Sequence, residues 1–187
     1  MERIFGRPLI TQDEIQKRIR ELGNQITQDY AEKKLVMIGV LKGAFPFYAD
    51  LVRSVRLLLK VDFIMVSNQT VTGKTRSGRV KVLSELTEEI KGQDVVLVED
   101  IISTGMTISY VKKKILSKKP KSLKLCTLLD KPERRKVRTS VKYAGFTIPN
   151  KYVVGYGLDY QNRYRNLPYI AVMDQVSEAE ELFYWQE

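Results

Sequence analysis

Long apolar runs separated by amphipathic stretches restrict the fold of this chain more than any other feature of its sequence. The run 35–40 contains no polar side chain, which is typical of a strand buried on both faces of a parallel sheet. Before it, Thr11 and Glu14 form a capping-box pattern that starts an apolar stripe at helical spacing. Strands that alternate with helices in this way form βαβ units. We therefore expect an α/β fold whose mostly parallel, twisted sheet is flanked by helices.

The rest of the chain continues this alternation. Helices are expected over residues 11–30, around 45–55, over 107–118 and over 177–185. Strands are expected over 35–40, 61–66, 80–83, 95–98, 123–129, 141–143, 152–156 and 169–173. The stretch 67–79 is polar and has neither period, so we expect a long mobile loop there. Because ligands of parallel sheets bind beyond the carboxyl ends of the strands, functional residues should lie in the loops that follow them.

The composition of the chain excludes several kinds of catalytic and metal site and indicates the charge of its ligands. The 187 residues suit one domain, 1–187, with a full core. The chain has no histidine, which excludes Ser-His-Asp and Cys-His catalysis and every zinc site that needs imidazole. Its 32 Lys+Arg against 22 Asp+Glu give a net charge of +10, which predicts attraction to nucleic acid, an anionic surface or a small phosphorylated substrate.

Cysteine usage and hydropathy suggest a location. The single Cys126 lies in the apolar run 123–129, so a small buried side chain is expected rather than a nucleophile. One cysteine permits no intramolecular disulfide, which favours a reducing compartment. The sequence shows no apolar segment of the signal-peptide or membrane-spanning kind. We expect a cytoplasmic protein without a membrane partner.

The segment 95–107 carries the most chemical information. In it an apolar strand leads through two acids into a Ser/Thr/Gly turn and the start of a helix. Backbone N–H groups at such a turn form an anion site, Thr104 adds a hydroxyl donor, and Gly105 permits close approach of a phosphate. Glu99 and Asp100 would repel phosphate at the same spot, but they suit sugar hydroxyls or an outer position around Mg²⁺. A phosphorylated sugar suits both the anion-binding turn and the two acids. The simpler alternative is a capped helix preceded by two solvated acids.

The same segment resembles the 5-phosphoribosyl-1-pyrophosphate signature of the type I phosphoribosyltransferases, and its context is similar to the hypoxanthine-guanine phosphoribosyltransferases. Four stretches follow the family's order over nearly the whole chain: 39–47, 95–107, 121–132 and 153–169. The resemblance implies the type I phosphoribosyltransferase fold, with a small hood subdomain built from the N-terminal segment and about 151–187. It also implies Mg²⁺ as cofactor, phosphoribosyl pyrophosphate and a 6-oxopurine base as substrates, and a homodimer or homotetramer.

For the ribose and phosphate groups, the resemblance implies three sets of binding residues. Leu41, Lys42 and Gly43 match the family's pyrophosphate loop, whose Leu-Lys peptide is often cis. Glu99 and Asp100 match the acids that bind the ribose hydroxyls, and both are candidate metal ligands. The cradle of the 5′-phosphate is matched by Ser103, Thr104, Gly105, Met106 and Thr107.

For the base, the metal and the leaving group, the resemblance implies five further roles. Lys131 matches the lysine that hydrogen-bonds the purine 6-oxygen, Tyr152 an aromatic that stacks on the base, and Val153 a backbone contact to its pyrimidine edge. Asp159 matches a magnesium ligand, and Arg165 a pyrophosphate-binding arginine. Lys131 and Arg165 are therefore catalytic candidates. Taken singly, Tyr152 could be a core tyrosine, and Asp159 and Arg165 could be solvated loop charges. Their joint occurrence in the order of the family favours a substrate-binding site.

The chain departs from the family at two places. Ser103 occupies the position where the family usually has an aspartate that exchanges a proton with N7 of the purine. A serine hydroxyl is a poor proton acceptor near neutral pH, so losing the carboxylate costs roughly 10²–10⁴-fold of general acid–base assistance. Asn68 and Gln69 stand where the family tends to have Ser-Tyr at the start of the mobile loop.

Three functions are compatible with these residues. The first is purine salvage: transfer of phosphoribosyl to N9 of hypoxanthine or guanine, giving IMP or GMP and pyrophosphate. Related enzymes for adenine and uracil also lack the aspartate, but Lys131 argues against adenine. The second is an impaired, nucleotide-binding regulatory paralogue. The third is an RNA-binding regulator on the same fold, although the lysines at 112–121 fit a solvated helix face better, so no nucleic-acid partner is expected.

Overall fold

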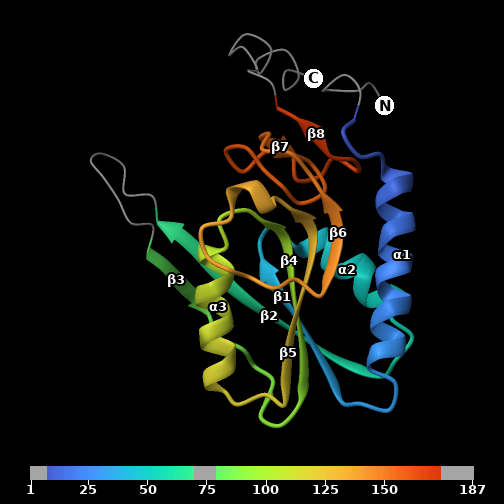
Figure 1. Cartoon of the computed structure of the whole chain (residues 1–187), viewed down its shortest axis with the longest axis vertical. Helices are drawn as coiled ribbons and strands as arrows, with labels where there is room; N and C mark the ends of the chain where they lie inside the picture. The colour runs from blue at the N-terminus through green and yellow to red at the C-terminus, as the bar shows by residue number, and fades with distance from the viewer. Residues whose placement is uncertain (1–7, 70–78, 174–187) are drawn as a thin grey trace.

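A six-stranded sheet forms the centre of the computed structural model, which describes residues 8–69 and 79–173 (Figure 1). The order across the sheet is β3-β2-β1-β4-β5-β6. All neighbours pair in parallel except β2 and β3. The expected α/β fold with a mostly parallel sheet is therefore confirmed. The strands are β1 (Leu35–Leu41), β2 (Leu59–Gln69), β3 (Arg79–Ser84), β4 (Asp94–Ile102), β5 (Ser122–Asp130) and β6 (Tyr143–Thr147).

Helices cover both faces of the sheet because successive side chains of a strand point to opposite sides. The helices α1 (Gln12–Asp29) and α2 (Phe45–Ser54) pack on the face that contains Met37. The helix α3 (Met106–Ser117) packs on the other face, over Ile38. Figure 1 shows α1 and α2 on one side of the sheet and α3 on the other. This two-sided burial explains why the run 35–40 contains no polar residue.

The capping box predicted at the start of α1 is present. The Thr11 hydroxyl accepts a hydrogen bond from the Glu14 N–H at 3.3 Å, and the Glu14 carboxylate accepts one from the Thr11 N–H at 2.8 Å. Two N–H groups that no helical carbonyl can reach are thereby satisfied. The apolar stripe that follows, including Ile15 and Ile19, is fully buried against the sheet.

Cys126 lies in β5 and is fully buried in the core that β5 shares with α1 and α2. Burial raises the pKa of its thiol. The side chain is therefore the small buried apolar group that its sequence context predicts. Within residues 8–69 and 79–173, no helix is long and apolar enough to cross a membrane.

Two strands extend further than their apolar runs. β4 continues through both acids to Ile102, because β5 pairs with it as far as the register Ile102↔Asp130. β2 continues to Gln69 because it pairs antiparallel with β3, with Asn68 opposite Val80. Residues 67–69 and 79, which the polar composition assigns to a loop, are thus strand. Residues 70–78 of that expected loop lie outside the described residues.

The C-terminal part of the chain forms a second, smaller sheet. Its strands β7 (Val153–Val154) and β8 (Ala171–Val172) are antiparallel and shorter than the expected 152–156 and 169–173. A bridge between Ile10 and Ile170 ties the N-terminal segment to it, and Figure 1 shows this sheet beyond the carboxyl ends of the central strands. The strand expected at 141–143 lies at 143–147 instead, where β6 pairs with β5. The helix expected at 177–185 lies outside the described residues.

Candidate active site

The loop after β1 meets the end of β4. The two strands are neighbours, with Gly39 opposite Val98, so their carboxyl ends open at the same edge of the sheet. The Leu41–Lys42 peptide is cis, as the family resemblance implies. The next residue, Gly43, lies against Asp100: a Cβ at Gly43 would stand 1.6 Å from Asp100 Oδ2. Only glycine lets the loop approach the acid so closely.

The two acids at the end of β4 are poorly solvated. Burial, followed by the negative charge of Asp100, raises the pKa of Glu99 well above its ordinary value. Burial also raises the pKa of Asp100, opposed by hydrogen bonds with the Glu99 side chain and the Ile101 N–H and by the positive charge of Arg165. A ligand that brings hydroxyl donors or a cation would stabilise the charged forms of both acids.

The turn between β4 and α3 is built around Gly105. This residue is the N-cap of α3 and has the left-handed φ of 81°, which favours glycine. A Cβ there would stand 2.8 Å from the carbonyl oxygen of Val137. The Thr104 carbonyl accepts hydrogen bonds from the N–H groups of Lys136 at 3.0 Å and Val137 at 3.1 Å. The packing of this turn therefore requires the glycine, independently of any phosphate.

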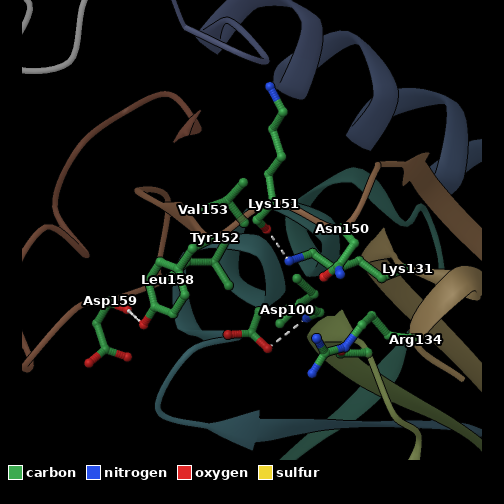
Figure 2. A pocket seen from close by; sticks show the side chains of 11 residues that line it. Asp100, Lys131, Arg134, Asn150, Lys151, Tyr152, Val153, Leu158 and Asp159 are labelled. Atoms are coloured by element: carbon green, nitrogen blue, oxygen red, sulfur yellow. Dashed lines mark hydrogen bonds between the residues drawn. The ribbon is translucent and has the colours of Figure 1, made fainter. Parts of the chain in front are cut away.

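A pocket of about 630 Å³ opens beyond the carboxyl ends of β4 and β5 (Figure 2). The end of β4, the turn that follows β5, and the segment leading into and out of β7 contribute its walls. The lining residues are Asp100, Ile101, Ser103, Lys131, Arg134, Asn150, Lys151, Tyr152, Val153, Leu158 and Asp159.

Lys131 is a nearly buried cation in this pocket, with 8% of its surface exposed. Its ammonium donates a hydrogen bond to the backbone carbonyl of Lys151. Burial, followed by the positive charge of Arg134, lowers its pKa. Figure 2 shows the Lys131 ammonium facing that carbonyl, while the side chain of Lys151 leads away from the pocket. An ammonium has three protons to donate, so Lys131 retains donors for a ligand.

Tyr152 is anchored at its tip and exposed along its ring. Its hydroxyl donates a hydrogen bond to the Asp159 carbonyl at 2.8 Å, and its ring meets Tyr160 edge-on with centroids 6.0 Å apart. More than half of the residue, 55%, is nevertheless exposed. A fixed aromatic ring with an open surface is suited to stacking on a flat ligand.

Asp159 and Arg165 connect the pocket to the loop after β1. Their side chains form an ion pair at 2.7 Å, and the other Arg165 nitrogen donates to the Gly157 carbonyl at 2.7 Å. The Asn162 N–H holds the second Asp159 oxygen at 2.8 Å. Gly157 in turn packs on Gly43, because a Cβ at Gly157 would stand 2.0 Å from the Gly43 carbonyl oxygen.

The structure brings six of the candidate residues into one pocket: Asp100, Ser103, Lys131, Tyr152, Val153 and Asp159. The other candidates adjoin it without lining it. The loop 41–43 approaches Asp100 through Gly43, Glu99 is buried near the end of β4, Arg165 pairs with Asp159, and residues 104–107 form the turn before α3 and its first two residues.

Sequence reasoning missed five lining residues, which are Ile101, Arg134, Asn150, Lys151 and Leu158. Arg134 belongs to the short 3-10 helix η1 (Pro132–Arg134), and its N–H donates to the Lys131 carbonyl at 3.2 Å. Side chains three residues apart in such a turn point the same way, which takes Arg134 into the pocket beside Lys131. The proline after Lys131 is a usable sequence signal for this turn.

The carboxylates fit a magnesium ion that a substrate helps to hold. Among the described residues no three carboxylate, cysteine or histidine side chains gather as a complete metal cage. Asp100 and Asp159 nevertheless both line the pocket. Mg²⁺ is usually bound through one or two carboxylates, with water and substrate phosphates completing its shell. The donor set is therefore compatible with Mg²⁺ bound together with a phosphorylated substrate.

Comparison with known proteins identifies the class of this domain. The family model of the phosphoribosyl transferase domain matches residues 11–161, which include the acidic end of β4 and all the residues that line the pocket. The sheet order, the acids before the helical turn and the pocket thus belong to a phosphoribosyltransferase domain.

Individual relatives narrow the assignment. The chain is 45% identical to the hypoxanthine-guanine phosphoribosyltransferase of Bacillus subtilis, with 92% of this chain and 96% of that protein covered. The structure of a hypoxanthine phosphoribosyltransferase from Staphylococcus aureus is 42% identical, with a TM-score of 0.85 and coverage of 91% and 92%. The chain belongs to the hypoxanthine-guanine phosphoribosyltransferase family.

A longer relative has the same domain as one part of its chain. The bifunctional protein TilS/HprT of Listeria monocytogenes is 48% identical over 165 residues, which are 88% of this chain. The chain spans about a quarter, 25%, of the length of that relative.

Proposed function

We propose that this chain is a purine-salvage phosphoribosyltransferase. It transfers the 5-phosphoribosyl group of phosphoribosyl pyrophosphate to N9 of hypoxanthine or guanine, and IMP or GMP and pyrophosphate are the products. The observation that carries this proposal is the convergence of Lys131, the exposed ring of Tyr152 and the carboxylates Asp100 and Asp159 around one pocket. Membership of the family supports the same activity.

The base occupies the part of the pocket between Lys131 and Tyr152. The Lys131 ammonium donates one hydrogen bond to the Lys151 carbonyl and one to the 6-oxygen of the purine. The same position in adenine is an amino group, which repels an ammonium donor, so Lys131 selects 6-oxopurines. Tyr152 stacks on the base through its exposed ring, and the backbone of Val153 contacts the pyrimidine edge.

The ribose and its phosphates lie along the end of β4. Glu99 and Asp100 accept hydrogen bonds from the ribose hydroxyls, which supply the donors that these poorly solvated carboxylates need. The 5′-phosphate lies at the N-terminus of α3, against the N–H groups and hydroxyls of residues 103–107. The loop 41–43 and Arg165 bind the pyrophosphate on the other side of Asp100.

Asp159 and the acids of β4 hold Mg²⁺ together with the substrate. When bound, Mg²⁺ neutralises negative charge that develops on the pyrophosphate. Arg165 contributes a second positive charge from the protein, and its ion pair with Asp159 keeps both groups beside the loop 41–43. In the reaction, N9 bonds to ribose C1 while the bond from C1 to the pyrophosphate oxygen breaks, through a dissociative, oxocarbenium-like state. Most of the rate enhancement then comes from positioning and from these charges.

The test is steady-state nucleotide formation with phosphoribosyl pyrophosphate, magnesium and each of hypoxanthine, guanine, xanthine, adenine and uracil. The native protein is expected to turn over 6-oxopurines and to leave adenine and uracil unreacted. Ser103→Asp is run in parallel, because it restores the carboxylate that the family usually has. If neither protein forms nucleotide with any of the five bases, the proposed activity is refuted.

The same proposal includes a homodimer or homotetramer, which the family resemblance implies, and a cytoplasmic location, which the single cysteine favours. Light scattering of the purified chain measures the oligomeric state directly, and a monomer at micromolar concentration would contradict that part of the proposal.

A further inference from the structure

The charged and titratable groups that face the pocket come from every element around it. They are Asp100 from β4, Lys131 and Arg134 from the turn after β5, and Tyr152 and Asp159 from the segment around β7; Lys151 also lines the pocket, but its ammonium leads away from it. Under the proposed function both carboxylates are engaged away from the base: Asp159 pairs with Arg165 and contributes to the Mg²⁺ site, and Asp100, which packs on Gly43, accepts hydrogen bonds from the ribose hydroxyls. Neither is therefore left to accept a proton from the base.

The two cations of the pocket, Lys131 and Arg134, differ from the carboxylates in their ion pairing. Among residues 8–69 and 79–173, neither Lys131 nor Arg134 forms an ion pair with a carboxylate. Lys131 donates only to a neutral carbonyl, and the 3-10 turn holds Arg134 on the same side. Two adjacent cations without a counter-ion create a local positive potential that attracts an anion.

Ser103 completes this wall of the pocket with a neutral group. A hydroxyl can donate or accept a hydrogen bond, but it does not take a proton from a neutral purine near neutral pH. A neutral base must lose one ring proton when N9 bonds to ribose, and the described pocket offers no free carboxylate or imidazole to receive it. A base that has already lost that proton needs no acceptor.

We infer that this pocket takes its purine as the monoanion, so that Ser103, Lys131 and Arg134 together select bases that ionise in solution. This inference rests on the proposed function. The step is balanced without a protein base: the N9 electron pair of the purine anion forms the bond to C1, and pyrophosphate leaves with the electron pair of the broken C1–O bond. Purines with a second ring carbonyl, such as xanthine, lose a proton near neutrality and are the favoured class; hypoxanthine ionises only in more alkaline solution.

The experiment is the pH profile of kcat/KM for xanthine and for hypoxanthine at saturating magnesium phosphoribosyl pyrophosphate. With the native protein, each profile should rise about tenfold per pH unit and level off at the pKa of the base itself, later for hypoxanthine than for xanthine. Ser103→Asp should raise the activity with hypoxanthine at neutral pH and remove the rise, because a carboxylate accepts the proton of the neutral base.

Two results would overturn the inference. A midpoint shared by both bases would belong to a protein group, and a flat hypoxanthine profile of the native protein would mean that the neutral base reacts without the carboxylate. Absence of nucleotide with both bases, in native and variant alike, would instead refute the proposed function.

A pair of charge variants tests the cationic wall. Arg134→Gln should lower kcat/KM for xanthine roughly tenfold, the worth of one partly screened ion contact, without changing KM for phosphoribosyl pyrophosphate. Lys113→Gln removes the same charge from an exposed position on α3 and should leave both constants unchanged. Equal losses in the two variants would show only the effect of net charge and would contradict the role of Arg134.

Discussion

Glu99 is a carboxyl group that the fold keeps in an unfavourable environment. Its pKa is raised well above the ordinary value of 4.5 by burial and by Asp100. The folded protein therefore binds the Glu99 proton more tightly than the unfolded chain does. Stability that is present at low pH is lost as the pH rises from about 4.5 through the raised pKa of the folded state. Ionisation of Glu99 in the ligand-free site therefore destabilises the folded protein.

Glu99→Gln tests this cost directly. The free energy of unfolding of the native apoprotein should fall as the pH rises above about 4.5, and the variant should show a smaller fall, because only Asp100 still contributes. Urea denaturation across this range measures both slopes. Glu133→Gln, at an exposed position, is the control and should retain the native slope. An unchanged slope in Glu99→Gln would contradict the assignment.

Lys131 should contribute specificity more than stability. Lys131→Met keeps the aliphatic stem but removes the ammonium, and kcat/KM with hypoxanthine or guanine should fall by roughly 10- to 100-fold, the worth of a hydrogen bond from a charged group. The affinity for adenine, which has no 6-oxygen and is not expected to react, should not fall in the same way. Because burial disfavours this ammonium, the variant should unfold at a temperature no lower than that of the native protein. Equal losses for all bases would indicate a general disturbance of the pocket.

At the scale of elements, the loop after β1 depends on contact between a glycine and an acid. Gly43→Ala should reduce kcat/KM by about 100-fold or more, because the added methyl group must displace Asp100 by an ångström or more from its position at the end of β4. Gly92→Ala is a matched control: Gly92 has a φ of 68° but nothing within 4 Å of its added Cβ. It should cost about 1 kcal/mol of stability and leave kcat/KM intact. Similar activity in the two variants would contradict the positioning role.

How well each element could be predicted depended on how it is buried. The runs that became β1, β4 and β5 are apolar because both faces of each strand are covered, so periodicity alone identified them. The last residues of β4 were not predicted as strand, because Glu99 and Asp100 have the composition of a loop although their backbone still pairs with β5. The small sheet was overestimated in length, since each of its strands pairs over only two residues.

On the scale of the whole molecule, the small sheet is fastened to the helices through one buried phenol. The Tyr156 hydroxyl donates a hydrogen bond to the Asp50 carboxylate of α2, which also accepts a hydrogen bond from Gln16 of α1 at 2.7 Å and pairs with Arg53. Three parts of the chain thus meet at one carboxylate. This contact lies beside the turn that carries Gly157 onto Gly43.

Tyr156→Phe should reduce the free energy of unfolding by about 1–3 kcal/mol, because a hydrogen bond to a charged acceptor is lost while the ring remains. Tyr169→Phe is the opposite case, since the Tyr169 hydroxyl is buried without a partner among the described residues. Its removal should be neutral or stabilising. Chemical denaturation of both variants measures the difference, and equal destabilisation would contradict the role of the Asp50 contact.

The site as a whole was predictable in its chemistry but not in its connections. The motif positions placed Lys131, Tyr152 and Asp159 among the candidates, and the fold brings them together because the segment around β7, which carries Tyr152 and Asp159, lies against the turn that follows β5 and carries Lys131. The position of Arg134 in the pocket depends on a 3-10 turn. The pairing of Asp159 with Arg165 depends on residues with left-handed backbone conformation within 155–164. Such conformations have no periodic signature in sequence.

The burial of Cys126 has a practical consequence for labelling this protein. Because the only thiol of the chain is enclosed in the core and its thiolate is disfavoured, maleimide reagents should leave the folded native protein unmodified. A cysteine introduced at any exposed position then becomes the single attachment point for a fluorophore or spin label, without prior removal of the native one. The molecule is in this sense already prepared for spectroscopy.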